Sequence, residues 1–141
     1  MEMENPLLAF LAKSPNYVIS SPLSVPKSKT KKFILNLNVY RNTHFFTLNT
    51  AKRNYEEIIA EQVRGLPVLR SPLVFVYNLY PSRECDVSNI CCIHDKFFLD
   101  TLVSMGKIPT DSFKTTPIEI YRFCEEVKKP KLEIYIYENC I

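Results

Sequence analysis

Alternation between apolar and polar side chains predicts most of the strands in this chain. Every second residue from Phe33 to Val39 is apolar, which is the period of a strand that buries one face, and this predicts a strand over Lys32–Tyr40. A polar, basic turn at Pro26–Lys32 precedes it. Runs rich in β-branched and aromatic residues predict four further strands, at Tyr17–Leu23, Leu73–Tyr80, Ile118–Phe123 and Leu132–Tyr137. The apolar run Phe45–Leu48, after a polar, turn-like segment at Arg41–His44, is the third strand before the first helix.

Two segments have the spacing of helices instead. Thr50–Arg64 carries apolar residues every three to four positions, and Gly65 stands where such a helix should end. The apolar residues of this helix are Tyr55, Ile58, Ile59 and Val63. A second helix is predicted from Ser88 or Asn89 to Met105, and it is apolar on nearly every side. We therefore expect the second helix to be mostly buried.

The order of these elements predicts a single α+β domain. Three strands, a helix, a strand, a helix and two strands favour a mixed β-sheet with two main helices packed on it. The chain has 141 residues, of which 46% are apolar and 23% charged, and this is the size and composition of one globular domain. We place that domain at residues 15–141, after an irregular N-terminal segment at residues 1–14.

The chain has no pattern of a membrane span or a secretory signal. Its longest apolar stretches have the length of strands, far short of the roughly 18 residues that a spanning helix needs. The N-terminal apolar patch Leu7–Ala12 follows Glu2 and Glu4 rather than a basic region. We therefore expect a cytoplasmic protein that has no membrane partner.

The cysteines are expected to be reduced thiols. There are five of them, an odd number, in a chain that is large enough to fold without disulfides. Cys91, Cys92 and His94 are close together in the sequence, as the ligands of a zinc ion can be. However, adjacent cysteines on one helix point about 100° apart, so a zinc site is not favoured there.

Charge is distributed unevenly along the chain. The segment from Asn5 to Tyr55 contains no aspartate or glutamate, although the whole chain has a net charge of only +3. A basic half of this kind indicates a polyanionic partner such as DNA, whereas the simpler interpretation is a solubilising basic tail. The candidate DNA-binding residues are Lys29, Lys31, Lys32, Arg41, Lys52 and Arg53.

A polar stripe runs along the second predicted helix. Asn89, Lys96 and Asp100 fall within about 40° of one another on a helical wheel. The simpler interpretation of this stripe is an exposed Lys96–Asp100 ion pair. However, Asp86 lies just before the helix and Asp111 follows it by one short loop, so carboxylates, an amide and a lysine can converge. Oxygen ligands of this kind bind Mg²⁺, and a nearby lysine stabilises charge on a phosphate.

These residues resemble a known family. The run Asp86-Val87-Ser88-Asn89-Ile90 and the segment from Asp95 to Ser112 resemble the RusA family of phage and prophage Holliday junction resolvases. That family opens a helix with an Asp-Leu-Asp-Asn motif, carries a lysine and an Asp-Ala-Leu on the helix, and places a glycine and an Asp-Asp pair after it. Residues between Leu37 and Tyr55 look like the basic segment of the longer phage members. The resemblance covers residues 33–138.

The resemblance implies roles for five residues. Asp86 and Asp111 match metal-binding aspartates, with Mg²⁺ as the expected ion and Mn²⁺ as the alternative. Asn89 and Asp100 match the motif asparagine and the helix aspartate, and Lys96 matches the lysine that acts on the scissile phosphate. The implied protein is a homodimer in a bacterial host cell that cuts four-way DNA junctions symmetrically, without a small-molecule cofactor.

Two departures from the family pattern leave alternatives open. Ser88 and Thr110 each replace an aspartate with a hydroxyl, which is a neutral and weaker Mg²⁺ ligand; Glu84 or Asp100 are candidates for the missing charge. One alternative is therefore a catalytically weakened protein that still binds junction DNA. Others are a nuclease with a broader preference for branches or flaps, and an unrelated α+β interaction module.

Aromatic and histidine side chains near the basic segment have two interpretations each. Tyr40, Phe45 and Phe46 either stack on exposed bases or, as such residues more often do, belong to the core. His44 either contacts phosphate or is a surface or capping histidine, and His94 is expected to lie in the core or an interface.

Overall fold

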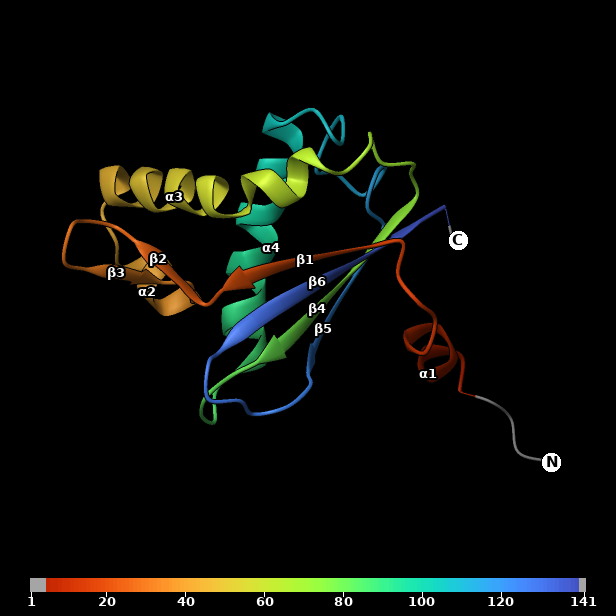
Figure 1. Cartoon of the computed structure of the whole chain (residues 1–141), viewed down its shortest axis with the longest axis horizontal. Coiled ribbons are helices and arrows are strands. Elements are labelled where there is room, and N and C mark those ends of the chain that lie inside the picture. Colours follow the sequence, from red (N-terminus) through yellow and green to blue (C-terminus); the bar gives the residue numbers. More distant parts are fainter. Residues whose placement is uncertain (1–4, 140–141) are drawn as a thin grey trace.

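A four-stranded mixed sheet organises the protein. The computed structural model describes residues 5–139. The strands β1 (Tyr17–Pro22), β4 (Leu73–Tyr80), β5 (Ile118–Phe123) and β6 (Lys131–Glu138) are arranged in the order β1-β6-β4-β5, as Figure 1 shows. β6 is antiparallel to both of its neighbours, and β4 and β5 are parallel. The predicted α+β class is therefore confirmed.

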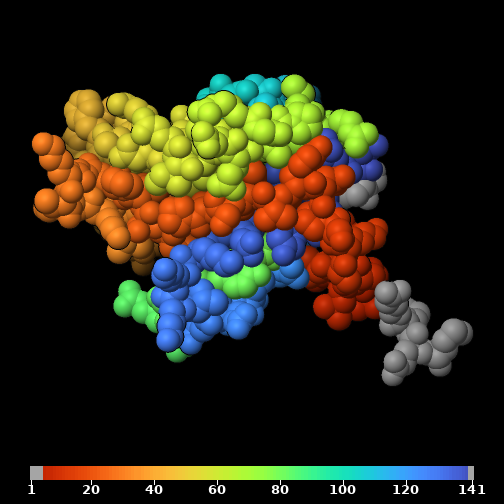
Figure 2. Space-filling view, viewed as in Figure 1, coloured from red at the N-terminus to blue at the C-terminus, as the bar shows by residue number. Residues whose placement is uncertain are grey.

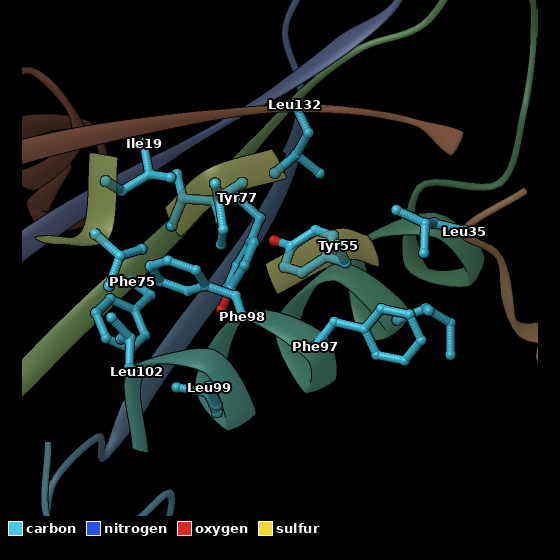
Figure 3. Packing of buried hydrophobic residues seen from close by; sticks show 14 of the residues in the cluster. Ile19, Leu35, Tyr55, Phe75, Tyr77, Phe97, Phe98, Leu99, Leu102 and Leu132 are labelled. Carbon is cyan, nitrogen blue, oxygen red and sulfur yellow. The ribbon is translucent and has the colours of Figure 1, made fainter. Parts of the chain in front are cut away.

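Two long helices cover one face of this sheet. α3 (Phe45–Arg64) packs on β1, and α4 (Val87–Ser104) packs on β4 and β5. The core between them is aromatic: the ring centroids of Phe75 and Phe98 lie 5.5 Å apart, and those of Tyr55 and Phe97 lie 5.7 Å apart (Figure 3). Nine of the 18 residues of α4 are buried. No helix within residues 5–139 is long and apolar enough to cross a membrane.

A short helix covers part of the other face of the sheet. The segment expected to be irregular contains α1 (Pro6–Leu11), which begins after Asn5, whose side chain accepts a hydrogen bond from the Leu7 N–H. Phe10 and Leu11 pack against the outer side of β4 and β6, and the Phe10 and Tyr137 rings lie 4.7 Å apart. Burial of Phe10 therefore orders a segment whose sequence has no helical periodicity.

The predicted strand over Lys32–Tyr40 is wrong in its second half. A short hairpin, β2 (Ser24–Pro26) and β3 (Lys32–Ile34), is followed by the helix α2 (Leu37–Arg41). The Asn36 side chain accepts a hydrogen bond from the Val39 N–H at 2.8 Å and so caps α2. Asparagine in this position favours the start of a helix, and this local bond outweighs the alternating pattern.

The helix α3 starts five residues earlier than predicted. His44 is its N-cap, because the His44 Nδ1 accepts a hydrogen bond from the Phe46 N–H, which confirms the capping interpretation of His44. Phe45 and Phe46 are 64% and 71% exposed, so the core interpretation of these two residues is wrong. Ile58, expected on the buried side, is 42% exposed. The buried residues recur every four positions instead, at Ala51, Tyr55, Ile59 and Val63.

His94 is buried in the core, as expected. It is fully buried in α4, and its Nδ1 lies 3.2 Å from the Ser21 hydroxyl of β1, while its Nε2 has no hydrogen-bond partner among the described residues. Burial lowers the pKa of His94 to about 3. The folded protein therefore keeps this imidazole neutral at pH values where an unfolded chain protonates it.

We expect the stability of the fold to decrease below pH 6.5. Between pH 6.5 and about 3 the unfolded chain binds a proton at His94 that the folded chain does not, so the free energy of unfolding falls as pH falls. The contribution is up to about 1.4 kcal/mol per pH unit. Urea unfolding of the wild type and of His94→Gln, measured from pH 7 to pH 4, should show a shallower slope in the variant. Equal slopes of unfolding free energy against pH in the two proteins would contradict the lowered pKa of His94.

Candidate active site

Asp86 caps the N-terminus of α4. The loop after β4 brings its backbone into an extended conformation, and its Oδ1 accepts hydrogen bonds from the Ser88 N–H at 3.1 Å and the Ser88 Oγ at 3.0 Å. A carboxylate in this position satisfies a free N–H group and interacts favourably with the helix dipole. Ser88, which stands where the family has an aspartate, therefore acts here as a hydrogen-bond donor to Asp86.

The predicted polar stripe lies on the exposed side of α4. Asn89 and Asp100 are partly buried and Lys96 is exposed. Asp100 does not pair with Lys96: its Oδ2 lies 2.7 Å from the Lys52 Nζ of α3, and the Lys96 Nζ lies 6.0 Å from the centre of the Tyr40 ring. The simpler interpretation, an ion pair within the helix, is therefore wrong. Lys96 makes no ion pair with any described residue.

Asp111 lies beside the C-terminal half of α4. The loop after Gly106 folds back, as predicted, and Asp111 lines a recess together with Asp100. The other residues of the recess are Lys52, Glu56, Val103, Ser104, Pro109 and Thr110. The structure thus brings together Asp100 and Asp111, with Lys52 between α3 and α4.

Asp86 and Asp111 do not meet within one chain. They flank opposite ends of α4, whose 18 residues span about 27 Å. Within residues 5–139, no group of three or more histidine, cysteine, aspartate or glutamate side chains is placed to hold a metal ion. Mg²⁺ is commonly held by one or two carboxylates and water, so Asp100 and Asp111 together are suitable Mg²⁺ ligands. Asp86 and Asp111 of a single chain do not fit one ion.

A buried acidic network lies behind the stripe, and sequence reasoning missed it. Asp95 of α4 is 6% exposed, and its two carboxylate oxygens accept hydrogen bonds from the Tyr77 and Tyr121 hydroxyls, each at 2.7 Å. Burial, followed by the hydrogen bond and the charge of Asp95, raises the pKa of Glu119 to about 9. Glu119 itself is exposed on β5, and with this raised pKa its carboxyl is protonated beside Asp95 at neutral pH.

The sequence did contain a signal for this network. Asp95 falls on the side of the helical wheel that is otherwise apolar, where a carboxylate requires partners. Glu119 and Tyr121 are two positions apart on β5 and so face α4 together. What the sequence lacked was the pairing of β4 with β5, which brings Tyr77 next to Tyr121.

The candidate DNA-binding cations are mostly exposed. Lys29 and Lys31 lie in the turn of the hairpin, Lys32 begins β3, and Arg41 ends α2. These residues and Arg53 make no ion pair among the described residues. Lys52 differs from them, because its ammonium is held by Asp100.

A groove connects the hairpin to the loop that carries Asp86. It is lined on one side by Leu23, Ile34, Leu35 and Asn36, and on the other by Arg83, Glu84 and Cys85. Ile34, the exposed last residue of β3, and Ile90, in the first turn of α4, therefore face the same surface depression.

No family model matches this chain, and no curated protein matches its sequence. The resemblance to the RusA family thus remains a prediction from the motif residues.

We expect Glu119→Gln to stabilise the protein at alkaline pH. The folded state holds a proton on Glu119 between pH 4.5 and about 9, so the stability that this proton contributes is lost as pH rises through that range. Glutamine stays neutral and retains a donor for Asp95. Unfolding by urea should show similar stability of variant and wild type near pH 4.5 and greater stability of the variant near pH 9. The exposed Glu125→Gln is the control, and parallel pH profiles for all three proteins would contradict the assignment.

Proposed function

We propose that this protein is a metal-dependent endodeoxyribonuclease that cuts branched DNA such as four-way Holliday junctions. The observation that carries the proposal is the arrangement on α4: Asn89, Lys96 and Asp100 share its outward side, next to cations that make no ion pair with any residue in 5–139. A phage or prophage protein in the cytoplasm of a bacterial host fits this activity.

The DNA-binding surface of this proposal is the end of the molecule formed by the hairpin, α2 and the start of α3. Figure 2 shows the hairpin and the first turns of α3 together at one end. Lys29, Lys31 and Lys32 are exposed there, and Arg41 lies close enough to Cys92 of α4 to lower the pKa of its thiol, although burial raises that pKa more strongly. Cations in such a row bind phosphates without reading the base sequence.

Lys96 is the residue best placed to act on a bound phosphate. Lys96 is exposed and makes no ion pair within the described part of the chain, and it lies between Tyr40 of α2 and the acidic recess of Asp100 and Asp111. A phosphodiester that extends from the basic end toward that recess would pass Lys96. In the proposed site a Mg²⁺ ion, when bound, supplies Lewis-acid chemistry, and Lys96 stabilises negative charge on the phosphate.

A DNA-binding protein without useful cleavage is the second candidate. It is favoured by the Ser88 hydroxyl, which replaces a carboxylate and occupies Oδ1 of Asp86. Thr110, at the second departure from the family pattern, likewise offers a neutral oxygen in the recess of Asp111.

Cleavage of a synthetic four-way junction is the direct test. With Mg²⁺ or Mn²⁺, the wild type should make paired symmetric nicks on the junction and leave a linear duplex intact, and EDTA should abolish them. Asp111→Asn and Lys96→Ala should each lower the rate by about 10²-fold or more, because each removes a charge that acts on the reacting phosphate. Glu57→Gln, an exposed acid elsewhere on α3, is the control. Tight junction binding without cleavage in either metal would leave the second candidate.

Removal of hairpin lysines should weaken DNA binding uniformly. Lys29→Ala and Lys31→Ala should each lower affinity for junction and duplex alike, and should reduce the slope of log affinity against log salt concentration by about 1. The single variants Lys128→Ala and Lys129→Ala, in the turn between β5 and β6, are the matched controls, because those exposed lysines lie outside the proposed surface. An equal loss in the controls would show that only net charge matters. Fluorescence anisotropy at several salt concentrations measures both quantities.

A further inference from the structure

Three aromatic side chains form an exposed cluster at the start of α3. The aromatic cluster consists of His44, Phe45 and Phe46, which are the N-cap and the first two residues of the helix. Phe45 and Phe46 are 64% and 71% exposed, and their ring centroids lie 5.5 Å apart. The His44 and Phe46 ring centroids lie 5.4 Å apart, with 30° between the ring planes. The cluster therefore presents large ring faces to solvent.

The fold does not account for these rings. The buried side of α3 is formed by Ala51, Tyr55, Ile59 and Val63, which begin after the first turn. Burial would stabilise either phenylalanine, yet both remain on the surface. A first helical turn commonly carries acidic residues that interact with the helix dipole, and the first turn of α3 has none. A contiguous exposed apolar patch of this kind typically marks an interaction site.

The surroundings of the aromatic cluster are basic. The hairpin packs along α3, where the Asn54 side chain donates a hydrogen bond to the Pro26 carbonyl at 2.5 Å. The turn of the hairpin, with the exposed Lys29 and Lys31, and the first turns of α3 lie at the same end of the molecule (Figures 1 and 2). Between Asn5 and Tyr55 the sequence contains no acid that could neutralise these cations. An anionic ligand is therefore attracted to this end.

The side of α3 that continues from the cluster is polar. Arg53 follows Phe46 by seven residues, or about two helical turns, so both lie on the same side of the helix. Arg53 is exposed and makes no ion pair with any residue in 5–139, and Asn49, between the two, is exposed as well. A helix that lies on a membrane has an apolar face along several turns. The apolar surface here is instead confined to one turn.

His44 adds a hydrogen-bond donor to the cluster. Its Nδ1 accepts a hydrogen bond from the Phe46 N–H at 3.3 Å, which holds the imidazole beside the Phe46 ring. A neutral imidazole that accepts at Nδ1 carries its proton on Nε2. The Nε2 of this exposed residue is therefore a donor for a base carbonyl or a phosphate oxygen.

Unpaired DNA matches this combination of groups. Its bases have flat faces that stack on aromatic rings whatever their sequence, and its phosphates bind lysine and arginine. In a linear duplex the base faces are covered by neighbouring base pairs, so only the cations could be used. The rings therefore favour a single strand over a duplex.

We propose that His44, Phe45 and Phe46 bind unpaired bases by stacking, while the lysines of the hairpin turn hold the phosphates, so that this end of the protein binds single-stranded DNA. This binding site goes beyond the proposed cleavage of branched DNA. It shares the basic surface with that proposal, and it needs neither a metal ion nor the acidic residues of α4.

A comparison of DNA with and without bases tests the stacking. Fluorescence anisotropy in EDTA would measure binding of an oligothymidylate of about 12 nucleotides and of an abasic strand of the same length. The wild type should bind the oligothymidylate at least about fivefold more tightly. The double variant Phe45→Ala/Phe46→Ala should lose this difference and keep its affinity for the abasic strand. Phe123→Ala, which removes a ring that is 54% exposed on β5, is the control and should keep the difference. Circular dichroism should show the same fold in all three proteins.

Two further variants separate stacking from apolar contact. Phe46→Leu keeps an apolar side chain without a ring face, so it should weaken binding of the oligothymidylate, whereas Phe46→Trp should retain it. The chain has no tryptophan, so the indole of Phe46→Trp is the sole source of tryptophan emission. Oligothymidylate should quench this emission and the abasic strand should not.

The opposite results are equally specific. Equal affinity of the wild type for the two strands, or a difference that persists in Phe45→Ala/Phe46→Ala, would overturn the inference. So would a blue shift of the Phe46→Trp emission with phosphatidylserine vesicles and no quenching by oligothymidylate, which would assign the cluster to a membrane surface.

These measurements are independent of the proposed cleavage. A protein that distinguishes the two strands through Phe45 and Phe46 but cuts no four-way junction would support the binding site and refute the nuclease. Junction cleavage by a protein that binds both strands equally would support the nuclease and refute the binding site.

Discussion

The position of α4 depends on one buried carboxylate. Asp95 accepts hydrogen bonds from tyrosines on two neighbouring strands, Tyr77 of β4 and Tyr121 of β5. Burial and then the contacts with Asp95 raise the pKa of both hydroxyls, which keeps them protonated as donors. Two bonds to different strands fix the rotation of the helix about its axis as well as its distance from the sheet. Because successive residues of a helix are about 100° apart, fixing Asp95 inward turns the adjacent Lys96 toward solvent.

The same carboxylate connects the core with the surface beyond β5. A lone charge at 6% exposure is costly, and the two tyrosine hydroxyls that donate to Asp95 reduce that cost. Glu119, whose pKa is raised by burial and by the neighbouring Asp95, stands on the strand at the edge of the sheet. An ionised Glu119 would repel both Asp95 and Asp111, so the neutral form is the one compatible with this packing. The buried Asp95 thus favours the neutral form of Glu119 on the edge strand β5.

Hydrophobic periodicity predicted the elements that keep one strand or helix period along their whole length. β4, β5, β6 and α4 occur within two residues of their expected bounds. β4, β6 and α4 each bury a continuous face or stripe, whereas β5, which has no buried residue, was predicted from its β-branched and aromatic residues. The prediction of a strand over Lys32–Tyr40 was wrong in its second half, because the alternation is equally compatible with a short helix that Asn36 caps. For the site, the helical wheel placed Asn89, Lys96 and Asp100 on one side correctly. The wheel could not show that Asp100 pairs with Lys52 of α3 instead of Lys96. It also could not show that two tyrosine hydroxyls donate to Asp95. Both interactions depend on contacts between segments that are distant in the sequence. The separation of Asp86 from Asp111 was accessible from the length of the helix alone.

The two carboxylate oxygens of Asp86 differ in their hydrogen bonding at the start of α4. Oδ1 holds the Ser88 N–H and hydroxyl, and the hydrogen bonds described for Asp86 leave Oδ2 free for another ligand. A ligand that took Oδ1 as well would uncap the helix, at a cost of about 1 kcal/mol. The first turn of α4 therefore favours ligands that bind Asp86 through one oxygen, because a ligand that chelates both oxygens has to displace the cap.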